Sequence, residues 1–142
     1  LLQRMHRVRA GGAIATKRIA SALELSFEEA ELMKRRVKKE DKEFLDVKRA
    51  NHTCYDRAWQ EFRQVIKEYE DTVSTKIETV YLTGGGSLFP GTKTAVEEAL
   101  QKKVSYVNTF DKVAYPAFME DMINELAPTF HVALGSALRV FE

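Results

Sequence analysis

The sequence has little of several residue types that mark common protein classes. Its 142 residues include one cysteine, Cys54, which excludes an internal disulfide framework and fits a reducing compartment. No apolar run approaches the ~20 residues of a membrane-spanning helix, and no signal-peptide pattern opens the chain. The 22 basic and 21 acidic residues give a formal net charge of +1, so the basic surplus of nucleic-acid-binding modules is missing.

What remains is the composition of a globular domain. Hydrophobic residues make up 44% of the chain and charged residues 30%, which excludes a disordered tail and a membrane core. At this length we expect one domain that buries roughly 70% of its unfolded-chain surface. The first residue is Leu1 and not Met, so we expect the sequence to be a piece of a longer protein.

Local patterns predict an α/β domain with two to three strands and five or six helices. Alternation and β-branched residues predict strands, and 3.6-residue spacing and helix-start signals predict helices. The expected strands are residues 1–8, 76–83 and 104–107. The expected helices begin at Ala13 and at the Ser26–Glu29 capping box, then cover residues 44–69, 92–100, 116–126 and 128–140.

The longest periodic segment is residues 44–69, where apolar residues recur at helical spacing and form one stripe. Asn51 interrupts this stripe. We expect the stripe and Trp59 to form part of the hydrophobic core and not a groove for a partner, because burial in the core is enough to explain apolar residues at this spacing.

The strongest local signal for a site is the glycine run Gly84, Gly85 and Gly86, which follows the predicted strand 76–83. Without side chains, backbone amides come close to a flat or anionic ligand, and the helix that follows presents its positive N-terminal end. The run matches neither GxGxxG nor a P-loop. A plain loop is therefore an open alternative.

A second signal is the set Glu31, Lys34 and Arg35, which share one helix face because they are three and four residues apart. A carboxylate accepts hydrogen bonds from ribose hydroxyls, and a guanidinium stacks on a purine. An ordinary intrahelical ion pair has the same spacing and stays open as an alternative.

Other chemistry finds no support in the sequence. The six basic residues in 34–42 have Glu40, Asp41 and Glu43 beside them and fit a solvated helix end. His52 and Cys54 lack the second pair of a zinc site, so no metal site is expected. The three histidines fall in unrelated segments, and no catalytic residue is assigned.

Four ordered motifs carry a family resemblance: residues 11–20, 30–34, 82–86 and 130–139. Their order resembles the C-terminal part of the actin-like ATPases of the FtsA/PilM group. Residues 108–110 and 116–118, with the closing segment that begins at Pro128, are more similar to PilM-type type IV pilus assembly proteins than to FtsA. The resemblance covers nearly the whole chain.

The resemblance implies a second-lobe part of the actin-like (ribonuclease-H-like) ATPase fold, with helices packed on a small mixed sheet. Residues 1–142 would form one portion of that lobe, with a mainly helical subdomain at 13–75 and an α/β subdomain at 76–142. The implied nucleotide contacts are Glu31, Lys34, Arg35, Gly84, Gly85, Gly86 and Leu88, the last near the base. Thr16 is a less certain contact.

The sequence also departs from the family pattern. Nothing in residues 1–9 matches the Asp-x-Gly phosphate hairpin that this fold places upstream. The implied cofactor is ATP, with Mg in the intact protein. We expect this chain to hold the adenosine side of the site and not to hydrolyse ATP alone.

The function implied by the resemblance is adenine-nucleotide binding in type IV pilus assembly, as a cytoplasmic component of an inner-membrane complex. The implied partners are other pilus inner-membrane assembly proteins, which would tether the protein to the membrane indirectly. A homo-oligomer is allowed, and no nucleic acid is expected. The alternatives are an FtsA-like cell-division protein and an interaction scaffold that does not bind nucleotide.

Overall fold

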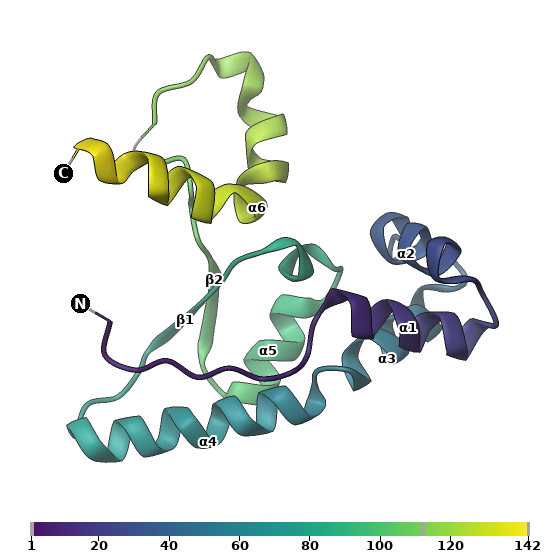
Figure 1. Cartoon of the computed structure of the whole chain (residues 1–142), viewed down its shortest axis with the longest axis horizontal. Helices are drawn as coiled ribbons and strands as arrows, with labels where there is room; N and C mark the ends of the chain where they lie inside the picture. The colour runs from purple at the N-terminus through teal and green to yellow at the C-terminus, as the bar shows by residue number, and fades with distance from the viewer. Residues whose placement is uncertain (1, 112, 142) are drawn as a thin grey trace.

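The computed structural model describes residues 2–111 and 113–141 and has the expected α/β character (Figure 1). Helices dominate, and a small sheet lies in the second half of the chain. The elements in order are α1 Gly12–Leu23, α2 Phe27–Arg36, α3 Phe44–Thr53, α4 Asp56–Val73, β1 Thr79–Leu82, η1 Gly85–Leu88, α5 Thr92–Leu100, β2 Lys103–Tyr106, η2 Ala117–Met119, α6 Glu120–Leu138 and η3 Arg139–Phe141.

The first three helices pack into a helical cluster beside α4 (Figure 1). The predicted capping box is confirmed: the Ser26 hydroxyl accepts from the Glu29 amide at 3.2 Å, and the Glu29 carboxylate accepts from the Ser26 amide at 2.9 Å. The buried residues of this cluster come from all three helices and from the loops beside them: Ile19, Ala30, Val37, Phe44, Val47 and Phe89. This packing fixes α2 against α1.

The sheet has two parallel strands, so the expectation of a mixed sheet is wrong. Thr79 lies opposite Lys103, and Leu82 lies opposite Tyr106. Parallel strands need a crossover connection, which α5 supplies. A second core holds the sheet against α4 and α5 and contains Val96, Leu100 and Val104, packed by Trp59, Ile66, Val80 and Leu82.

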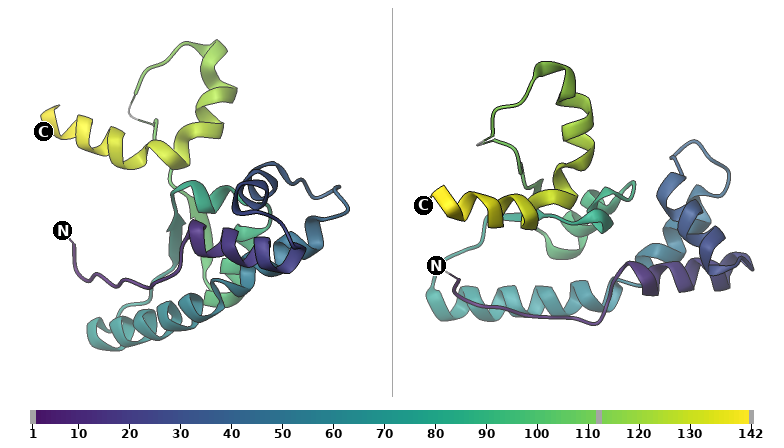
Figure 2. Two further views of the ribbon diagram at one scale, coloured as in Figure 1. Left: turned by 45° about the vertical axis from the view of Figure 1, so that its right-hand side comes forward. Right: turned by 45° about the horizontal axis from the view of Figure 1, so that its top comes forward.

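The strand expected at residues 1–8 is also wrong for the part that the structure describes; Leu1 lies outside the described residues. Residues 2–10 run as an extended segment alongside α4 in both views (Figure 2). Side chains hold the segment there: Arg4 pairs with Glu68 at 2.9 Å, and the His6 ring meets Phe62 edge-on. Because α4 offers only side chains, the segment finds no backbone partner with which to form a ladder.

The helix expected over residues 44–69 is two helices, α3 and α4. The chain turns at Cys54 and Tyr55, whose amides donate to the carbonyls of Asn51 at 3.2 Å and His52 at 2.7 Å. These bonds span three residues and replace the four-residue pattern of an α-helix. The turn separates α3, whose Phe44 and Val47 lie in the first core, from α4, whose Trp59 and Ile66 pack on the second. The later stripe residues Phe62, Val65 and Tyr69 lie instead beside the N-terminal segment, so this part of the stripe does not belong to either core.

The two helices expected at 116–126 and 128–140 are one helix, α6, with Pro128 inside it. Figure 1 shows that α6 bends sharply along its length. Proline lacks the amide that would continue the helix and crowds the preceding turn, which explains the bend. The Pro128 carbonyl accepts from the Gly84 amide at 2.6 Å, so the bend is fastened to the glycine run.

None of the described helices combines the length and the apolar character that crossing a membrane requires.

Candidate functional site

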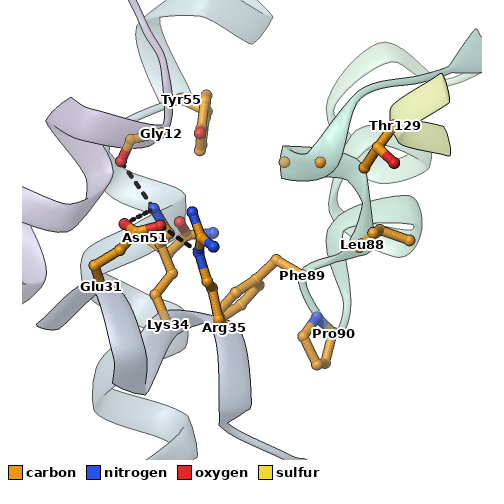
Figure 3. A pocket seen from close by; sticks show the side chains of 12 residues that line it. Gly12, Glu31, Lys34, Arg35, Asn51, Tyr55, Leu88, Phe89, Pro90 and Thr129 are labelled. Atoms are coloured by element: carbon orange, nitrogen blue, oxygen red, sulfur yellow. Dashed lines mark hydrogen bonds and ion pairs between the residues drawn. The ribbon is translucent and has the colours of Figure 1, made fainter. Parts of the chain in front are cut away.

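A cavity of about 460 Å³ separates the helical cluster from the glycine run, within the roughly 300–1,000 Å³ usual for small-molecule sites. Figure 3 shows its two walls, with Glu31, Lys34, Arg35 and Asn51 on one and Leu88, Pro90 and Thr129 on the other. The lining residues are Gly12, Glu31, Lys34, Arg35, Asn51, Tyr55, Gly85, Gly86, Leu88, Phe89, Pro90 and Thr129.

On the helical wall, Glu31 accepts hydrogen bonds from three side chains. Lys34 donates to Glu31 Oε2 at 2.5 Å, and Arg35 Nε donates to Glu31 Oε1 at 2.7 Å, as the helix spacing predicts. The Thr16 hydroxyl of α1 lies 2.5 Å from Glu31 Oε2 and accepts from Lys34 at 2.6 Å. Lys34 also donates to the Gly12 carbonyl at 3.1 Å. The set is therefore an interhelical clamp as well as an intrahelical ion pair.

The clamp keeps Glu31 ionised at neutral pH. Partial burial alone would raise the pKa of Glu31, but the hydrogen bonds from Lys34, Thr16 and Arg35 outweigh it and lower the pKa from 4.5 to about 2. A carboxylate accepts hydrogen bonds and donates none. Oε2 already accepts from Lys34 and Thr16, but among the described residues Oε1 accepts only from Arg35, so its second lone pair can accept a hydrogen bond from a ligand hydroxyl.

On the opposite wall, the glycine run forms a tight turn. Gly84 has a φ of 85°, a conformation that favours glycine. The Ser87 hydroxyl closes the turn by donating to the Gly84 carbonyl at 2.7 Å. Gly85 and Gly86 have no positive φ, and a Cβ on them would lie 3.8 Å from Thr129 Cγ2 and 3.8 Å from the Tyr55 hydroxyl. Their missing side chains therefore leave room in the cavity and are not required by the turn.

The structure brings together most of the residues that the sequence analysis assigned to one site. Glu31, Lys34 and Arg35 line the cavity from α2, while Gly85, Gly86 and Leu88 line it from η1. Gly84 precedes the lining residues and shapes the turn that presents them. Leu88 is 46% exposed and adds apolar surface to the mouth of the cavity.

Six lining residues were not assigned as contacts from the sequence: Gly12, Asn51, Tyr55, Phe89, Pro90 and Thr129. Asn51 had a signal, since it is the polar interruption of an apolar stripe. No sequence signal marked Tyr55 or Thr129, because only the folded structure brings them to the cavity. The turn between α3 and α4 places Tyr55 there, and the bend of α6, which is bonded to Gly84, places Thr129 there.

Other site chemistry is sparse. The described residues contain no cluster of three His, Cys, Asp or Glu side chains that could hold a metal ion. Cys54 is buried. Burial, followed by the positive charge of Lys48, lowers the pKa of His52, and its Nε2 is buried without a hydrogen-bond partner in the described part of the chain. A neutral His52 ring fits its edge contacts with Trp59 and Phe89.

Comparison with known proteins gives a family and a related structure. The family described as type IV pilus assembly protein PilM matches residues 4–141. A solved structure titled "PilM-PilN type IV pilus biogenesis complex" has a TM-score of 0.73 and 28% sequence identity, over 90% of this chain and 36% of that chain. Our chain thus spans about a third of that relative's length, and no curated protein matches it. Because the family match covers nearly all of the sequence, the chain belongs to the PilM family of type IV pilus assembly proteins.

Proposed function

We propose that the cavity binds the adenosine part of an adenine nucleotide. The observation that carries the proposal is the pairing of an ionised, hydrogen-bond-accepting carboxylate on one wall with a side-chain-free turn on the other. Ribose offers hydroxyl donors to the first, and a flat purine fits against the second. ATP is the nucleotide that we expect, in line with the resemblance to actin-like ATPases.

On the helical wall, Oε1 of Glu31 would accept from a ribose hydroxyl. Lys34 would hold the carboxylate in place, because its side chain is only 14% exposed and reaches α1 as well as Glu31. A carboxylate held by two helices is preorganised, so little conformational entropy is lost when ribose binds.

The base would lie between Arg35 and the glycine turn. The Arg35 side chain is 74% exposed, and the bond from its Nε to Glu31 leaves the face of the guanidinium available for stacking. Gly85 and Gly86 present backbone to the other face of the base, and Leu88 adds an apolar contact at the edge.

The phosphates and Mg would be held by parts of the protein other than this chain. No Asp-x-Gly hairpin occurs in these 142 residues, and the described residues offer no acidic metal cluster. The chain's share of the proposed site is therefore binding of the nucleoside and not the chemistry at the phosphates.

We propose further that the protein acts as a cytoplasmic component of an inner-membrane pilus assembly complex. Support comes from the family match and from the related solved structure, which contains PilM together with PilN. A partner of the PilN kind would link the protein to the membrane. The family match favours pilus assembly over an FtsA-like role in cell division.

A fluorescent ATP analogue titrated into the full-length protein tests nucleotide binding. We expect saturable binding that Arg35→Ala weakens about fivefold, as loss of a cation–π contact of about 1 kcal/mol would do. Arg36→Ala is the matched control: it removes the same charge from the next position of α2, and Arg36 does not line the cavity. Absence of saturable binding to the unmodified protein would favour the interaction scaffold that does not bind nucleotide.

A further inference from the structure

Asn51 is a polar residue where α3 otherwise buries apolar ones. The buried positions of α3 are Phe44, Val47 and Asn51, spaced three and four residues apart on one face. Only 3% of Asn51 is exposed, and no described residue forms a hydrogen bond with its side-chain amide. Leucine would complete the stripe. The amide atoms of Asn51 are not among the fully buried described atoms without a partner, so they keep access to the cavity that the residue lines, and there water is their only partner.

The position of Asn51 gives this amide a use. It lines the cavity, and Figure 3 shows it on the same wall as Glu31 and Arg35. Residues that break a local folding rule without compensation inside the protein tend to belong to functional sites. A ligand in the cavity would supply a hydrogen-bond partner for this amide.

We infer that Asn51 forms a pair of hydrogen bonds with the edge of the adenine base. The inference rests on the proposed function, since it assumes that a purine occupies the cavity. An asparagine amide offers an acceptor and a donor side by side. Adenine presents the complementary pair, an amino donor at N6 beside a ring-nitrogen acceptor. Guanine can also pair with the amide, through its O6 acceptor beside its N1 donor, but it differs from adenine in having two adjacent donors, N1 and N2, that suit a carboxylate.

The chemistry predicts opposite results for two substitutions. Asn51→Asp replaces the amide by a group that only accepts, which opposes the ring nitrogen of adenine and suits the N1 and N2 donors of guanine. We expect ATP affinity to fall about tenfold or more and GTP affinity to rise, so that the ATP:GTP affinity ratio falls or inverts. Asn51→Leu loses both hydrogen bonds, and we expect it to bind ATP about tenfold more weakly while raising the melting temperature of the nucleotide-free protein.

The measurement is competition of ATP and of GTP against a bound fluorescent ATP analogue, with the full-length protein and each variant. Gln60→Glu is the matched control, because it makes the same amide-to-carboxylate change on the exposed face of α4. It should keep the ATP:GTP ratio. Asn51→Leu keeps the test decisive if Asn51→Asp does not fold.

The outcomes separate this inference from the proposed function. ATP binding with an unchanged ATP:GTP ratio in both Asn51 variants would overturn the role of Asn51 and leave the nucleotide site standing. Failure of the unmodified protein to bind either nucleotide would overturn the nucleotide site itself, and the role of Asn51 with it. A lower melting temperature for Asn51→Leu would show that the amide has a structural partner and would also contradict the inference.

Discussion

Replacing Glu31 by glutamine tests the clamp at the centre of the proposed site. Glu31→Gln keeps the length of the side chain and one carbonyl oxygen but removes the negative charge. Lys34 would then lie mostly buried without its counter-ion, and Thr16, which is fully buried, would lose a charged acceptor and keep the Gly12 carbonyl. The substitution should therefore lower both the stability of the protein and its affinity for nucleotide.

The magnitude follows from the pKa of Glu31. A carboxyl whose pKa falls from 4.5 to about 2 on folding contributes up to about 3 kcal/mol to the free energy of unfolding at neutral pH. The side chain is 25% exposed, so solvent screening reduces this to about 1–2 kcal/mol. ATP affinity should fall about tenfold or more, since hydrogen bonds to a charged acceptor contribute about 1.5–3 kcal/mol.

The stability term has a defined pH dependence. Because folding lowers the pKa of Glu31, its contribution is fully present above about pH 5 and is lost as the pH falls toward 2. Urea unfolding of the protein and of Glu31→Gln at pH 7 and at pH 3 measures the difference directly. Glu28→Gln, on the exposed first turn of the same helix, is the control and should change little. Equal stability of the two proteins at pH 7, or a difference that does not shrink in acid, would refute the reasoning.

Three further outcomes are expected. Gly85→Val should abolish ATP-analogue binding with little change in the nucleotide-free melting curve, because its Cβ meets only Thr129, at 3.8 Å; unchanged affinity would mean that the glycine serves only the turn. Ser26→Ala removes the capping box and should lower the free energy of unfolding, measured in urea, by about 1 kcal/mol. Ser21→Ala, at an exposed position of α1, is the control and should leave it unchanged; equal effects of the two substitutions would show that the cap is not the cause. The 142-residue chain alone should release no phosphate from ATP, and release above a heat-treated control would contradict the assignment of the phosphate chemistry to other parts of the protein.

Local signals in the sequence predicted local structure well. The Ser26 cap, the helix over 92–100 and the strand before Gly84 needed only capping, periodicity and turn rules, and the structure confirms them. The pairs of Glu31 with Lys34 and Arg35 also followed from helix spacing. These features depend on residues a few positions apart.

The remaining features depend on contacts between distant segments. Spacing within α2 says nothing of Thr16 on α1, so the sequence could not reveal that Glu31 joins two helices. The stripe from Phe44 onward continues across the turn at Tyr55, but its α3 part lies in the first core, whereas most of its α4 part packs against the N-terminal segment. Pro128 looked like a boundary between helices, yet tertiary packing keeps it within α6, where its carbonyl holds the glycine run.

Asn51 shows how a weak signal gains meaning from the fold. In the sequence it was an interruption of an apolar stripe, which many surface helices also have. In the structure it is buried, lies in the cavity and has no described partner, and these observations together turn the interruption into a candidate contact for a base.

The most direct test of the account is a crystal structure of the full-length protein with a non-hydrolysable ATP analogue. The account predicts a ribose hydroxyl within hydrogen-bonding distance of Glu31 Oε1. It also predicts the base between Arg35 and the Gly85–Gly86 turn, with its edge facing Asn51. A nucleotide bound elsewhere, or a cavity that stays empty at saturating nucleotide, would contradict it.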